Sequence, residues 1–134
     1  MFSMSWTASI ESISDITEHV QAELVRLGLD SHRLMKVNLA IEEITVNIIN
    51  HAYGEGERGS IAVSIEKTDS QVIIHIFDEG VPFNPLDAKG PDVNAPMAER
   101  PIGGLGIFMA KNLVDGITYE RRGARNHLML INAL

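Results

Sequence analysis

The sequence predicts an α+β domain with a largely antiparallel sheet and helices on one face. Residues 61–65 and 72–76 both alternate apolar and polar side chains, and Thr68-Asp69-Ser70 between them is typical of a hairpin turn. Two helical patterns precede these strands. Since strands come in runs rather than alternating strictly with helices, the α+β class is favoured. At 134 residues and 45% hydrophobic content, the chain is long enough for one domain, residues 1–134, with its own core.

The first half begins with a strand and continues with two helices. Residues 2–9 alternate apolar and polar and predict the strand. Ser12 or Ser14 is expected to cap a helix that runs to about Leu27, where Gly28 stops it. Asp30 or Ser31 then caps a second helix that runs to about Tyr53.

The second half contains a long segment without apolar periodicity. All five prolines fall within residues 80–102, and a loop of that length inside a domain is usually a lid or a disordered segment. A short helix over about 105–114 follows, and then two closing strands, 117–121 and 127–131.

Composition excludes several classes of protein. The formal net charge of −7 argues against a nucleic-acid binder, whose affinity comes from Lys and Arg on phosphates. The absence of cysteine excludes disulfides, thiol nucleophiles and cysteine-ligated metal centres. No stretch reaches the ~18 apolar residues of a membrane span, and the N-terminal residues lack a signal-peptide pattern. We therefore expect a cytoplasmic protein without membrane or nucleic-acid partners.

The second helix carries a narrow polar strip between apolar residues. At 100° per residue, Glu43 and Asn47 share this strip with His51 nearby, whereas Glu42 points about 100° away toward Asn38. One interpretation is an ordinary amphipathic helix. The other is a pocket wall, in which the carboxylate serves as a general base and the amide oxygen as a ligand for Mg²⁺.

Two glycine-bearing loops are ambiguous when each is taken alone. Asp78 and Gly80 follow a strand, which suits a simple turn, but also a carboxylate that accepts from an exocyclic amine such as that of adenine. Gly103-Gly104-Leu105-Gly106 opens a helix, which suits a linker, but also a phosphate site at a helix N-terminus. The sequence contains no Walker A loop and no Rossmann fingerprint.

In combination and in this order, the motifs resemble the ATP-binding GHKL superfamily. They correspond to its N box, G1 box and G2 box. More narrowly, LAIEEITVNIINHAY, FDEGVPFNP and GGLGIFMAKNLVD are similar to the anti-sigma-factor serine/threonine kinases. The resemblance implies the GHKL (Bergerat) two-layer α/β sandwich with a mixed, mostly antiparallel sheet.

The resemblance also implies residue roles. Glu43 matches the catalytic base, Asn47 the magnesium ligand, and His51 a position near the phosphates. Asp78 matches the residue that reads adenine, with Gly80 beneath the base, and Val81 is a further ATP-binding position. The remaining ATP-binding positions are in the second glycine loop: Gly103, Gly104, Leu105, Gly106 and Ile107. Residues 81–102 correspond to the ATP lid, in which Lys89 or Arg100 could reach the γ-phosphate.

The implied function is an ATP- and Mg²⁺-dependent serine/threonine protein kinase that phosphorylates an anti-anti-sigma (STAS-type) partner and sequesters a sigma factor. The alternative is an ATP-binding regulatory module with little or no kinase activity. The family's dimerisation further implies a homodimer. The chain departs from the family at Gly123-Ala124-Arg125-Asn126, where a Gly-Thr pair often stands, and this leaves that secondary contact open.

Overall fold

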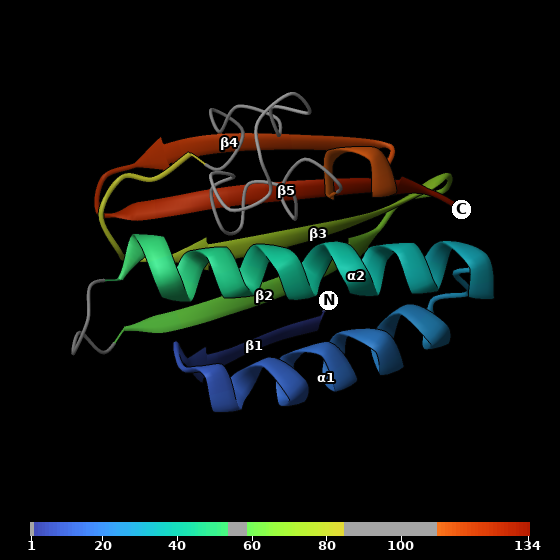
Figure 1. Cartoon of the computed structure of the whole chain (residues 1–134). Helices are drawn as coiled ribbons and strands as arrows, with labels where there is room; N and C mark the ends of the chain where they lie inside the picture. The colour runs from blue at the N-terminus through green and yellow to red at the C-terminus, as the bar shows by residue number, and fades with distance from the viewer. Residues whose placement is uncertain (1, 54–58, 85–109) are drawn as a thin grey trace, which may run out of the picture.

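The computed structural model describes residues 2–53, 59–84 and 110–134. Five strands form one sheet in the order β1-β2-β3-β5-β4. Their bounds are Phe2–Thr7 (β1), Ser60–Lys67 (β2), Gln71–Asp78 (β3), Gly116–Arg122 (β4) and Arg125–Ala133 (β5). The helices α1 (Ile13–Arg26) and α2 (Ser31–Asn47) lie side by side over one face (Figure 1). This confirms the α+β sandwich, although every neighbouring pair of described strands is antiparallel, so the expected mixed character is not seen in this part.

The core lies between the helices and the inner strands of the sheet. Alternate residues of β2 and β3 face the helices and are almost fully buried, among them Ile61, Val63, Ile74 and Ile76. Side chains alternate between the two faces of a strand, so the period-2 pattern of the sequence becomes this buried layer. Each such Ile or Val stabilises the fold by about 1.5–3 kcal/mol relative to exposure.

Helix α2 begins where the sequence predicts. The Asp30 side chain accepts a hydrogen bond from the Arg33 backbone N–H at 2.9 Å, which satisfies one free donor of the first turn. Helix α1 follows a 3₁₀ turn, η1 (Ile10–Ser12), and Gly28 ends it with a φ of +95°. None of the described helices is both long and apolar enough to cross a membrane.

The α-helical part of the second helix ends earlier than predicted. After Asn47 the chain continues as a π-helical turn, η2 (Ile48–Ala52), instead of an α-helix to Tyr53. A π turn spaces its hydrogen bonds at i→i+5, so the 100° step applies as far as Asn47 but not to His51.

The closing hairpin is longer than predicted. Strand β4 gains a residue at each end, and β5 starts at Arg125 instead of His127. This extension brings Asn126 into the ladder opposite Asp78 of β3. The predicted turn between β2 and β3 is confirmed: the Thr68 N–H donates to the Gln71 carbonyl oxygen at 2.8 Å. Of the predicted helix 105–114, residues 110–113 are described and helical.

Candidate functional site

Asp78 is a buried carboxylate at the end of β3. It is 5% exposed, and its Oδ1 accepts from the Gly80 N–H at 3.0 Å and from Asn126 Nδ2 at 2.8 Å. Burial raises the pKa of Asp78 above its ordinary value, while these two hydrogen bonds and the positive charge of Arg121 oppose the rise. Both hydrogen bonds from described residues go to Oδ1, so Oδ2 is the oxygen that can accept from a ligand.

Asn47 lies on the same small cavity as Asp78. The lining residues come from α2, η2, β3, β4, β5 and the loop after β3: Asn47, Ile48, Asp78, Phe83, Tyr119, Asn126 and Leu128. Asn47 Nδ2 donates to the Glu43 carbonyl oxygen at 3.1 Å, which fixes the orientation of the amide. Its Oδ1 accepts no hydrogen bond from a described residue and is therefore available as a hard oxygen ligand.

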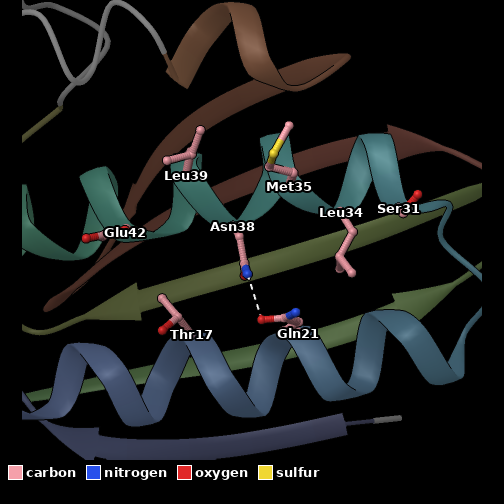
Figure 2. A pocket seen from close by; sticks show the side chains of 8 residues that line it. All are labelled: Thr17, Gln21, Ser31, Leu34, Met35, Asn38, Leu39 and Glu42. Atoms are coloured by element: carbon pink, nitrogen blue, oxygen red, sulfur yellow. Dashed lines mark hydrogen bonds between the residues drawn. The ribbon is translucent and has the colours of Figure 1, made fainter.

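Glu43 and Glu42 lie on different sides of α2, as the helical projection predicts. Glu43 is half-buried one turn before Asn47. Glu42 is exposed and lines a groove of about 500 Å³ between α1 and α2 (Figure 2). Asn38 lies in this groove and donates to Gln21 Oε1 at 2.9 Å, as the dashed line shows (Figure 2). The two neighbouring carboxylates therefore form a natural pair of test and control positions.

Position 80 requires a glycine, because the loop after β3 passes close to the backbone at the end of η2. A Cβ at this position would lie 2.3 Å from the Ala52 carbonyl oxygen. That oxygen accepts from the Val81 N–H at 2.9 Å, so the loop after β3 is fastened to the end of η2. The resemblance predicts a role for Gly80 beneath the adenine base, and the structure adds that the end of η2 also excludes a side chain here.

His51 lies beside the same loop. Its ring stacks on Phe83, with 5.3 Å between the ring centroids and 25° between the planes. Val81 is exposed, whereas Gly80 before it is buried. Of the predicted site residues, the structure thus gathers Asn47, His51, Asp78, Gly80 and Val81 where η2 meets the end of β3, with Glu43 one turn away.

The other predicted site residues lie outside the described part of the chain. They are Gly103, Gly104, Leu105, Gly106 and Ile107, together with Lys89 and Arg100 of the predicted lid. Of residues 81–102, only 81–84 are described.

The motifs of the sequence do not include the residues that support Asp78 and its loop. Tyr53 OH accepts from the Glu79 N–H at 2.8 Å and donates to the Ser60 carbonyl oxygen at 2.7 Å. Arg121 donates to the Gly80 carbonyl oxygen at 2.8 Å, and Tyr119 donates to Asn126. One signal was present: Asn126 has the same strand parity as the inward-facing Leu128 and Leu130.

A known family matches almost the whole chain. The family described as histidine kinase-like ATPase domain matches residues 6–132 of the sequence. The chain belongs to this family. The resemblance carried by the three motifs is therefore confirmed, and the histidine kinase-like ATPase fold accounts for the sandwich.

Curated relatives of this chain are serine kinases by name. The serine/threonine-protein kinase BtrW of Bordetella bronchiseptica is 29% identical over 70% of this chain and 66% of its own length. The serine-protein kinase RsbW of Bacillus mycoides is 34% identical over 69% of this chain and 59% of its own length. The matches thus span less than two thirds of the relatives' length.

Solved structures share the fold. A crystal structure of the RsbU and RsbW domains of a Mycobacterium tuberculosis protein covers 98% of this chain, with 32% of its own chain aligned, a TM-score of 0.64 and 16% identity. The histidine kinase domain of a blue-light activated kinase from Erythrobacter litoralis covers 91% of this chain and 61% of its own, with a TM-score of 0.59 and 12% identity. At these identities the likeness concerns the fold alone.

Proposed function

We propose that the protein binds Mg·ATP and transfers the γ-phosphoryl group to a serine of a protein partner. The observation that carries this proposal is the pairing of Asp78 and Asn47 in one cavity, each with an oxygen that no described residue occupies. The names of the relatives, serine kinases, support the reaction class.

The chain's own residues divide the task. Asp78 Oδ2 accepts from the exocyclic amine of adenine, which guanine lacks at the same ring position. Asn47 Oδ1 is the hard oxygen that holds Mg²⁺, and the free amide oxygen fits that cation. The bound cation supplies positive charge beside the phosphates.

Glu43 acts on the partner's serine. It accepts the hydroxyl proton while the serine Oγ bonds to the γ-phosphorus. The bond from that phosphorus to the bridging β-phosphate oxygen breaks, and ADP leaves. We propose an anti-anti-sigma factor as the partner and a sigma factor as the protein that is sequestered. This regulation of transcription would take place in the cytoplasm, with the kinase as a homodimer.

The decisive experiment measures transfer of a γ-phosphate label from Mg·ATP to candidate anti-anti-sigma proteins. Glu43→Gln should lower the transfer rate by about 10²–10⁴-fold, the usual contribution of a general base, while ATP affinity stays within about threefold. Glu42→Gln is the matched control, because Glu42 lies in the groove between α1 and α2 and should leave the rate unchanged.

Two outcomes would contradict the kinase proposal. Equal losses in the Glu43 and Glu42 variants would remove the special role of Glu43. Tight ATP binding without label on any partner would favour the regulatory binding module, in which ATP acts as a conformational ligand.

A further inference from the structure

Asn126 is buried at the junction of β5, the end of β3 and the loop that follows β3. It is 3% exposed. Its Nδ2 donates to Asp78 Oδ1 at 2.8 Å and to the Val81 carbonyl oxygen at 2.8 Å. One amide group therefore holds both the buried carboxylate and the first residue of the loop.

The orientation of this amide is fixed from its other side. Asn126 Oδ1 accepts from the Tyr119 hydroxyl, from the Phe83 N–H at 3.3 Å and from Arg121 Nη1 at 3.2 Å. A flipped amide would place its oxygen against the Asp78 carboxylate and its NH₂ group against two N–H donors. Every contact thus agrees on one orientation, with the donors toward Asp78.

The same contacts decide which oxygen of Asp78 is left for a ligand. Asn126 and the Gly80 N–H both occupy Oδ1. Arg121, which touches Asn126, also donates to the Gly80 carbonyl oxygen at 2.8 Å. The Asp78 carboxylate is therefore hydrogen-bonded through Oδ1 alone among the described residues. The same hydrogen-bond network also includes the backbone of residues 80, 81 and 83.

We infer that Asn126 is a positioning residue for nucleotide recognition: its amide orients Asp78 so that Oδ2 accepts from adenine, and it fixes the loop of residues 80–83 beside that oxygen. This inference rests on the proposed function, because it assigns Asn126 a role in the same adenine site.

Asn132 shows that a buried asparagine of β5 need not have such a role. It lies on the same face of the same strand and is 2% exposed. Its Nδ2 has no hydrogen-bond partner in the described part of the chain, and its ladder partner on β3 is Val72. Asn132 therefore serves as the matched control: the same residue type, burial and strand, at the opposite end of the sheet.

The test combines ADP binding by calorimetry with NMR titration of the Asp78 carboxyl group in nucleotide-free protein. Asn126→Ala removes a hydrogen bond to a charged group, so ADP affinity should fall about 10- to 100-fold and the pKa of Asp78 should rise. Asn132→Ala should change neither quantity. An unchanged Asp78 titration together with ADP affinity within twofold of wild type in Asn126→Ala would overturn the inference.

Asn126→Asp gives a second test without a change of size. At pH 8 two carboxylates would face each other, and ADP affinity should fall about 100-fold. As the pH is lowered, the pair takes up one shared proton, which restores a donor toward Asp78, so affinity should increase. Wild-type affinity should instead decrease on acidification, because Asp78 itself becomes protonated. A purely structural asparagine would not reverse this pH dependence, and no reversal would count against the inference.

The two proposals fail in different ways. Absence of ADP and ATP binding by the wild-type protein would refute the proposed function. The titration of Asp78 in the free protein would still decide whether Asn126 orients this carboxylate. Where the wild-type protein binds ADP, the pH dependence of Asn126→Asp decides the same point if Asn126→Ala does not fold.

Discussion

Two aspartates at opposite ends of the sheet differ in what surrounds them. Asp78 is 5% exposed, and burial raises its pKa. The side chain of Asp115 is 48% exposed. It accepts from the Ala133 N–H at 2.6 Å and from Arg33 at 2.8 Å, and these partners lower its pKa, the backbone hydrogen bond most strongly. The surroundings of Asp78 therefore disfavour its negative charge, whereas the partners of Asp115 stabilise its negative charge.

The difference separates the end of the sheet with the proposed site from the end with structural contacts. The end of the sheet at Asp78 holds a buried acid, a glycine in close contact with a helix end and a network around Asn126, and a buried acid with a shifted pKa is typical of functional sites. At the other end, the contacts of Asp115 fasten α2 to β5 in the manner of an ordinary structural ion pair. Substitutions at matched positions of the two ends should therefore have different consequences.

Gly80→Ala should have the largest effect on stability and on ATP binding at the end of the sheet that holds Asp78. Its Cβ would lie 2.3 Å from the Ala52 carbonyl oxygen, a contact between backbones that no side-chain rotation relieves. We expect a loss of about 2–4 kcal/mol in the free energy of unfolding, together with loss of ATP binding. Urea denaturation and calorimetry measure the two effects.

Gly116→Ala is the matched substitution at the other end. There a Cβ would lie 3.6 Å from the side chain of Ile131, an ordinary contact. The variant should stay within about 0.5 kcal/mol of wild type and bind ATP normally. Equal losses in both glycine variants would contradict the contrast between the ends.

Tyr53→Phe should have an intermediate effect. The hydroxyl bridges the Glu79 N–H and the Ser60 carbonyl oxygen, so its removal leaves two backbone groups without this partner. We expect a loss of about 1–2 kcal/mol in the free energy of unfolding. Hydrogen exchange of the Glu79 amide should become faster, while exchange in the Thr68–Gln71 turn at the other end stays unchanged. Uniform acceleration across the sheet would show that Tyr53 supports the whole fold and not this end.

The sequence predicts the fold well because periodicity encodes burial. The alternation in residues 61–65 and 72–76 and the Asp30 cap reappear as β2, β3 and the start of α2. The end of α2 was predicted less well, since nothing in the pattern from Asn47 to Tyr53 distinguishes an α turn from a π turn. That distinction depends on packing between distant segments.

The candidate site shows the same limit. Asp78, Gly80 and Asn47 were predicted because they lie in motifs whose chemistry is local in the sequence. Asn126 lies 48 residues from Asp78, and only the register of β3 against β5 brings the two side chains within 2.8 Å. Asn126 belongs to the segment in which the sequence departs from the family's Gly-Thr pair. Its contact with Asp78 shows what this residue does in the fold.

The smallest expected effects on stability come from the two aspartates themselves, and they have opposite signs. The folded-state pKa of Asp78 is raised above its ordinary value of 3.8, so the folded protein retains the proton longer and stability falls as the pH rises through that window. The folded-state pKa of Asp115 is lowered, so its stabilisation is present above the unfolded pKa and is lost as the pH falls through the folded one. At pH 7, Asp78→Asn should therefore leave the free energy of unfolding equal or higher, while Asp115→Asn lowers it by up to about 1 kcal/mol, a small value because Asp115 is half exposed.

Denaturant titrations at pH 7 and pH 3 separate these two signs. The stability deficit of Asp115→Asn should shrink at pH 3, because this pH lies below the ordinary pKa of 3.8, where the wild-type pairing begins to lose its stabilising effect. ATP affinity should fall sharply in Asp78→Asn and stay unchanged in Asp115→Asn, since an amide at position 78 keeps the contact to Asn126 through its oxygen but presents an NH₂ group to adenine. If Asp78→Asn lost stability at pH 7 and kept its affinity for ATP, the buried carboxylate would be a structural element, and the contrast between the two ends of the sheet would have to be abandoned.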